Sequence, residues 1–188
     1  DVTSQESIVA LRDAVRSWIK NAGIRGVGQV YKAPPWWIGA PTFTPVGTDL
    51  YSAALFVQID RGSESRITIP APDPQAGRSI DSGFVGAKNV TYNVSIGIIY
   101  RYLVPPGVLD PINGPLEDDW IVGLDLIIDT LKDRLRSDPL IGSTPTNVFQ
   151  VGQAANGIVD EQDGPTYDGA VITCWAAVRF IAEQIITA

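Results

Sequence analysis

The fold is decided by residues 89–104, which read NVTYNVSIGIIYRYLV. Apolar and aromatic side chains occupy the even positions from Val90 to Tyr102. The odd positions hold the polar residues Asn89, Thr91, Asn93, Ser95 and Arg101. Successive side chains of a strand point to opposite sides of a sheet, so this two-residue period predicts a long strand with one buried face and one wetter face.

Shorter strands are expected around this one. They lie at 27–32, 50–60, 66–69, 147–152 and 169–185. The polar segment 61–64, which contains Gly62, predicts a hairpin turn between 50–60 and 66–69. The acidic segment 160–165, which ends in Gly164 and Pro165, predicts a second turn just before the last strand.

Two stretches instead have helical periodicity. In the first, up to Gly23, apolar residues recur every three or four positions at Ile8, Leu11, Val15, Trp18 and Ala22. In the second, at 116–136, they recur at Ile121, Leu124, Ile128, Leu131 and Leu135. We therefore expect residues 1–188 to form a single α+β domain, a mostly antiparallel sheet covered by two α-helices. Long loops are expected at 33–48 and 70–87, the second of which also suits a β-hairpin arm.

Composition excludes much chemistry. The chain of 188 residues has no histidine and one cysteine, and its 21 acidic and 14 basic residues give a net charge of −7. Ser-His and Cys-His catalysis, an intrachain disulfide and a thiolate zinc site are therefore excluded, and we expect no enzyme activity and no cofactor. A pair of carboxylates is enough for a glycosidase, but no residue is nominated for that role. The sequence contains no run of about 18 apolar residues, so no membrane-spanning segment is predicted.

The charge is unevenly distributed along the chain. Residues 1–32 contain five bases and three acids, and residues 33–48 contain neither. Residues 110–138 contain eight acids and three bases, and residues 139–188 contain five acids and one base. Such uneven charge bears on how protein molecules associate, and it favours a protein whose copies stack against one another.

The uncharged loop 33–48 is unusual because it combines four prolines with aromatic residues. Its candidate interface residues are Trp36, Trp37, Ile38 and Phe43. Tryptophan is enriched at interface hot spots, so contact with another subunit is one interpretation. A lid over the chain's own sheet is equally compatible with the residues, and an aromatic platform for sugar is a third interpretation.

The acidic C-terminal half supplies a second group of candidates for a pore wall or an interface. They are Asp125, Asp129 and Asp133 on the second helix and Asp160, Glu161 and Asp163 in the acidic turn. Like charges four residues apart on a helix repel by about 0.2–0.5 kcal/mol per pair. An arginine of a neighbouring subunit, a cation, or water together with Lys132 would compensate. One helical line does not supply the converging oxygens of a metal site, so none is predicted.

The order of the elements resembles that of the tail terminator, or tail completion, proteins of long-tailed bacteriophages. The best-matching stretch runs from Leu116 to Ile181. It includes a helix that ends in Arg-Ser-Asp-Pro-Leu-Ile-Gly at 136–142, a strand, the acidic Gly-Pro turn and a final long strand. The helix from Ile8 to Trp18 supports the match.

This resemblance implies a structural virion protein at the head–tail junction, assembled in the cytoplasm of a bacterial host. It implies a homohexameric ring that ends tail-tube polymerisation and binds the tail tube protein on one side and a head-closure or connector protein on the other. DNA would pass through the ring without specific binding, since an acidic wall repels phosphate. A tube or head-closure protein of the same tail, and a carbohydrate-binding module using Trp36 and Trp37, remain alternatives.

Overall fold

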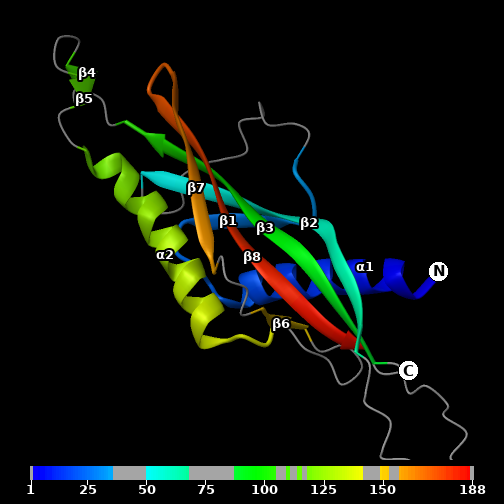
Figure 1. Ribbon diagram of the computed structural model, residues 1–188. Coiled ribbons are helices and arrows are strands. Elements are labelled where there is room, and N and C mark those ends of the chain that lie inside the picture. Colours follow the sequence, from blue (N-terminus) through cyan, green and yellow to red (C-terminus); the bar gives the residue numbers. More distant parts are fainter. Residues whose placement is uncertain are drawn as a thin grey trace, which may run out of the picture.

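The computed structural model describes residues 2–35, 50–67, 87–104, 109–110, 114–115, 118–141, 149–152 and 157–186. Its elements are α1 (Val2–Asn21), β1 (Val27–Tyr31), β2 (Tyr51–Ile67), β3 (Ala87–Leu103), β4 (Leu109–Asp110), β5 (Gly114–Pro115), the 3₁₀ helix η2 (Asp118–Ile121), α2 (Val122–Ser137), β6 (Phe149–Val151), β7 (Val159–Asp168) and β8 (Val171–Ile186). Figure 1 shows a curled sheet in which β3 and β8 run side by side. The expected α+β fold is confirmed.

The main sheet has the order β1-β2-β3-β8, and the far side of β8 is shared by two strands. β7 pairs with residues 171–179 of β8, and β6 pairs with residues 182–184. Every pair is antiparallel except β1 with β2, which is parallel. Among the described strands, β1 therefore forms one edge of the sheet, and β7 and β6 form the other.

The alternation along residues 89–104 is confirmed in β3. From Tyr92 to Tyr100 the even-numbered side chains are all buried in the core. Over the whole of residues 89–103 the odd-numbered ones are partly or fully exposed, with the exceptions of Gly97 and Ile99. The ring of Phe56, the cross-strand partner of Gly97, lies directly over Gly97. A Cβ placed at Gly97 would be only 2.0 Å from the Phe56 Cζ atom, so only glycine fits there.

Both helices contribute to one core with the buried side of the sheet. α1 contacts β1 and β2, and α2 contacts β8. The buried helical residues are Leu11, Val15, Trp18 and Ile19 of α1 and Leu124, Ile127, Ile128, Leu131 and Leu135 of α2. The two helices are also joined directly: the Trp18 indole N–H donates to Asp138 Oδ2 at 3.1 Å, and the Arg134 guanidinium lies 5.3 Å from the centre of the indole ring.

The hairpin predicted at 61–64 is wrong. Strand β2 continues to Ile67, and the polar segment forms a bulge in which two residues of β2, Gly62 and Ser63, lie opposite one of β3, Thr91. Thr91 of β3 forms hydrogen bonds with the backbone of the bulge. Its hydroxyl oxygen accepts from the Ser63 amide at 2.9 Å, and its hydroxyl group donates to the Ser63 carbonyl oxygen at 3.0 Å. Gly62 allows this approach, because a Cβ there would lie 2.3 Å from the Thr91 carbonyl oxygen.

The turn predicted at 160–165 is also wrong. These residues lie inside β7, and Gly164 and Pro165 fall where the pairing with β8 is irregular, between Asp163 and Thr166. The chain turns instead between Asp168 and Val171, which are paired. Gly169 has a φ of +60°, and glycine at the first position is typical of a two-residue hairpin turn.

The packing of α2 on the sheet depends on a close approach at Gly123. A Cβ at this position would lie 2.7 Å from the Tyr100 hydroxyl oxygen and 2.9 Å from the ring of Tyr51. The Tyr100 hydroxyl is fixed, since it donates to the Trp120 carbonyl oxygen at 2.6 Å.

We predict that Gly123→Ala lowers the free energy of unfolding measured in urea. The intrinsic helix preference of alanine over glycine favours the variant by about 1 kcal/mol. Overpacking a filled site costs about 1–3 kcal/mol, and we expect this cost to dominate. Thr130→Ala, at an exposed position of the same helix, is the control and should be neutral or slightly stabilising. A gain in stability for Gly123→Ala similar to the intrinsic preference would contradict the described packing.

Candidate functional site

The predicted acidic residues gather at one end of the sheet. We call them the acidic edge: Asp125, Asp129 and Asp133 of α2 and Asp160, Glu161 and Asp163 of β7. All ten residues of β7 are exposed. The two groups are separated by more than 25 residues in the sequence, and the fold brings α2 alongside β7 (Figure 1).

Two side-chain contacts join α2 to β7. The Lys132 ammonium group lies 2.5 Å from Asp160 Oδ1, and the Gln162 side-chain amide donates to Asp125 Oδ1 at 3.4 Å. Asp160 and Gln162 have the same strand parity, so both point to the helix-covered side of the sheet. The structure therefore brings Asp125 and Asp160 together on one surface.

Glu161 and Asp163 belong to the opposite, helix-free side of β7. Arg179 of β8 pairs with Glu161 at 2.8 Å. Asp163 Oδ1 accepts from the Gly164 amide at 3.0 Å, where the pairing with β8 is irregular. The six predicted residues thus lie along one edge, but they divide between two faces of the sheet.

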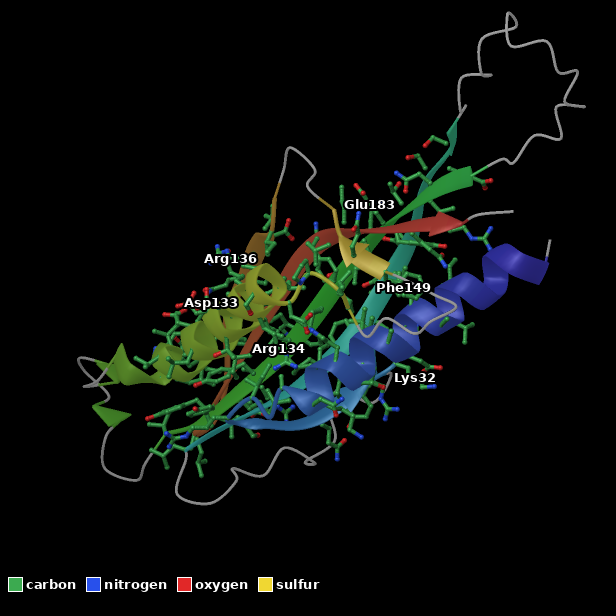
Figure 2. All side chains as sticks on the ribbon, turned by 90° about the horizontal axis from the view of Figure 1, so that it is seen from below. Lys32, Asp133, Arg134, Arg136, Phe149 and Glu183 are labelled. Carbon is green, nitrogen blue, oxygen red and sulfur yellow. The ribbon has the colours of Figure 1, made fainter. Side chains whose placement is uncertain are left out.

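The negative charge of the α2 carboxylates is compensated in part by a base of the same helix. Arg136 lies 3.0 Å from Asp133, and both side chains are largely exposed (Figure 2). Arg134 is not available for this role because it packs over Trp18. Asp129 has no hydrogen bond or ion pair with any residue that the structure describes. Over the same described ranges, no group of three or more His, Cys, Asp or Glu side chains is arranged to hold a metal ion.

A basic groove lies at the opposite end of the sheet, between α1 and β1. It encloses about 340 Å³ and is lined by Arg16, Ile19, Lys20, Gly23, Ile24 and residues 27–31. The Arg16 Nε donates to the Val30 carbonyl oxygen at 2.9 Å, and Lys20 is exposed. From the sequence, only a net positive charge over residues 1–32 was predicted, and the groove was not. The spacing of Arg12, Arg16 and Lys20 by four was a signal that these bases share one side of the helix.

The helix-free side of the sheet is hollowed and polar. A depression of about 490 Å³ is lined by Gln58, Asp60, Asn93, Val94, Ser95, Gly157, Val159, Glu161, Arg179, Phe180 and Ile181. Gln58, Ser95 and Arg179 are neighbours in one row across β2, β3 and β8. This side therefore presents hydrogen-bonding groups to solvent.

The aromatic candidates Trp36, Trp37, Ile38 and Phe43 lie outside the described residues. So do most of the two long loops, of which only 33–35 and Ala87 are described. The interface, lid and sugar-platform interpretations of these residues stay predictions.

Two ionisable groups are buried in the core, and burial raises the pKa of both. The Tyr100 hydroxyl has its pKa raised chiefly by burial and further by neighbouring Tyr51. The pKa of the Cys174 thiol is raised by burial and then by the charge of Asp163. Both groups are therefore neutral near pH 7, and the thiol is not activated as a nucleophile.

Comparison of the chain with protein-family models gives no match, and comparison with curated proteins gives none either. Neither described helix is both long and apolar enough to cross a membrane.

We predict that Cys174 resists labelling by a thiol reagent in the folded protein. Its side chain is 3% exposed and its raised pKa keeps the thiolate fraction small. The rate of reaction with 5,5′-dithiobis(2-nitrobenzoate) at pH 8 should be far below that of the same chain in guanidinium. Equal rates in the two conditions would show that the N-terminal part of β8 is not packed as described.

Proposed function

We propose that this protein is a structural subunit of a bacteriophage tail, a tail terminator that forms a ring at the head-proximal end of the tail tube. One observation carries the proposal: a single sheet ends in an acidic edge on one side and a basic groove on the other. A closed ring needs a head-to-tail interface, in which two different surfaces of each subunit meet. Opposite charge on the two ends of one subunit suits such an interface.

The arrangement of charged residues also supports assembly over catalysis. Glu161 is paired with Arg179, Asp160 with Lys132, and Asp133 with Arg136. The thiol and the phenol that are buried in the core are held neutral. These groups stabilise a surface, and no nucleophile and base are brought together among them.

The resemblance in element order supports the proposal in part. The helix from Ile8 to Trp18, the long strand β3, the helix α2 and the final strand β8 are all present. The acidic Gly-Pro turn that contributed to the resemblance is a strand, so this part of the match is withdrawn. In its place the protein has an exposed edge strand, which is a better surface for a neighbouring subunit than a turn.

In this role the ring stops the addition of tube subunits and offers its other side to a head-closure or connector protein. The acidic edge would lie at the bore or between subunits, and DNA would pass without specific contacts because carboxylates repel phosphate. A tube subunit with a related fold is the alternative within the same tail.

We predict that native mass spectrometry of the purified wild-type chain detects a closed oligomer, with a hexamer as the expected mass. Its stability should fall as the salt concentration rises, since charge attraction between exposed groups is screened. A chain that stays monomeric at every concentration and salt condition would contradict the proposal.

Imaging of assembled particles separates the terminator from the tube subunit. Labelled chain confined to a single ring at the neck is the result expected for a terminator. Label along the length of the tail would assign the chain to the tube, and its absence from particles would exclude both roles.

A further inference from the structure

The edge strand β7 presents unpaired backbone along its outer side. Among the described strands it pairs only with β8, and all its residues are exposed. An unpaired edge presents a row of N–H and C=O groups that another strand can pair with. The half of β7 before the irregularity, residues 159–163, is regular and contains Asp160, Glu161 and Asp163.

The opposite edge offers a matching site. β1 consists of five residues, pairs only with β2 among the described strands, and lines the basic groove. A strand added to β1 would lie in this groove, beside Arg16 and Lys20 of α1. In Figure 2 the orange β7 and the blue β1 lie at opposite margins of the sheet, so one chain does not fill its own groove.

We propose that residues 159–163 of a second copy of this chain pair with β1 in the basic groove, so that the sheet continues from subunit to subunit. This inference rests on the proposed function and names the segments through which the ring closes. The lengths agree, since 159–163 and Val27–Tyr31 are both five residues long. The charges agree, since Asp160 lies on the helix-covered side of β7, the side on which Arg16 and Lys20 of α1 line the groove.

Strand direction selects an antiparallel pairing. β1 runs parallel to β2, and each of the three following pairs along β2, β3, β8 and β7 is antiparallel, so β7 runs opposite to β1. If each copy keeps the same strand direction around a ring, β7 meets the next β1 antiparallel. An isologous contact is disfavoured, because β7 against β7 would oppose acids to acids.

The faces of the two strands fix the register. Gln29 pairs with Ala54 and Val30 with Leu55, so Val30 belongs to the buried side and Gln29 to the helix-free side. In a continuous sheet Gln29 must therefore meet a residue on the helix-free side of β7, and Glu161 is the central one. This register places Asp160 opposite Val30, whose carbonyl oxygen already accepts from Arg16. The acid and the base then lie on the same side of the joined sheet.

A cysteine pair tests this register directly. Residues opposite each other in an antiparallel pair have Cβ atoms about 4.5–5.5 Å apart, close enough for a disulfide after small adjustment. The double variant Q29C/E161C, mildly oxidised in its assembled form, should give a ladder of covalently linked chains up to the ring size. Cys174 is buried and is retained in every variant.

The controls are chosen for equal exposure. Q29C alone and E161C alone should give no ladder, because neither can join more than two chains. Q29C/L126C moves the second cysteine to an exposed site on α2, away from the β7 edge, and should also give no ladder. Circular dichroism and native mass spectrometry of each reduced variant establish that it is folded and show its oligomeric state.

Each outcome decides a different point. A ladder only in Q29C/E161C supports the pairing. A reduced Q29C/E161C ring that gives no ladder on oxidation overturns this register, and leaves the ring itself standing. Covalent dimers of Q29C alone in high yield would indicate β1 against β1 and also overturn it. Internally cross-linked single chains would show that the groove is filled from within. A wild-type chain that never assembles overturns both the pairing and the proposed function.

A charge exchange gives an independent test. Arg16 lines the groove, and the proposed register places Asp160 of the next copy opposite Val30, on the same side of the joined sheet as Arg16. Arg16→Glu or Asp160→Lys alone should weaken assembly several-fold in the concentration needed for half-association. A mixture of the two variants should recover as a ring in which they alternate, and the double variant in one chain should recover as well, because every interface then has opposite charges. A double variant no better than the single ones would overturn the contact.

Discussion

The constraint on which the structure depends is the pairing of β3 along nearly its whole length on both sides. From Lys88 to Tyr102 it is bonded to β2 and β8, so its backbone groups are satisfied and its alternate side chains are held in one buried face. That face supplies the middle of the core, from Tyr92 to Tyr100, against which both helices pack. Because β3 occupies the centre, β1 and β7 are left as edges.

The edges explain why the uneven charge of the chain matters. A small open sheet exposes two rows of backbone groups, and natural proteins protect such rows with charge, irregular pairing or a covering element. Here one edge carries carboxylates and the other lies in a groove with Arg16 and Lys20. Charge of one sign on each edge discourages pairing of like edges and permits pairing of unlike ones, which is the condition for a head-to-tail ring.

The sequence alone was sufficient for the parts of the fold in which the pattern is periodic. The alternation in 89–104 and the apolar residues of the two helices gave the sheet, its buried face and the fold class. Residue types that are typical of turns led to two wrong predictions. At 61–64 the Thr91 side chain satisfies a bulge, so the strand continues through polar residues. At 160–165 the outer side of the strand is unpaired, and Pro165 is tolerated because an edge strand can lack an N–H donor.

The candidate site was predicted only as two separate groups of acids. That α2 lies alongside β7, joined by Lys132 to Asp160, follows from tertiary packing and has no counterpart in local sequence. The separation of Glu161 from Asp160 onto different faces follows from strand parity, and it was missed because the segment was interpreted as a turn. The basic groove requires α1 and β1 to be placed side by side, which the charge balance of residues 1–32 does not convey.

We propose that copies of this chain join through unlike sheet edges into a closed ring. A cryo-electron microscopy map of the assembled wild-type protein, at a resolution that separates strands, tests it most directly. We expect a ring in which β7 of each subunit lies antiparallel to β1 of the next, with the sheet unbroken across the boundary. A ring joined through its helices, with β1 and β7 both exposed to solvent, would contradict it.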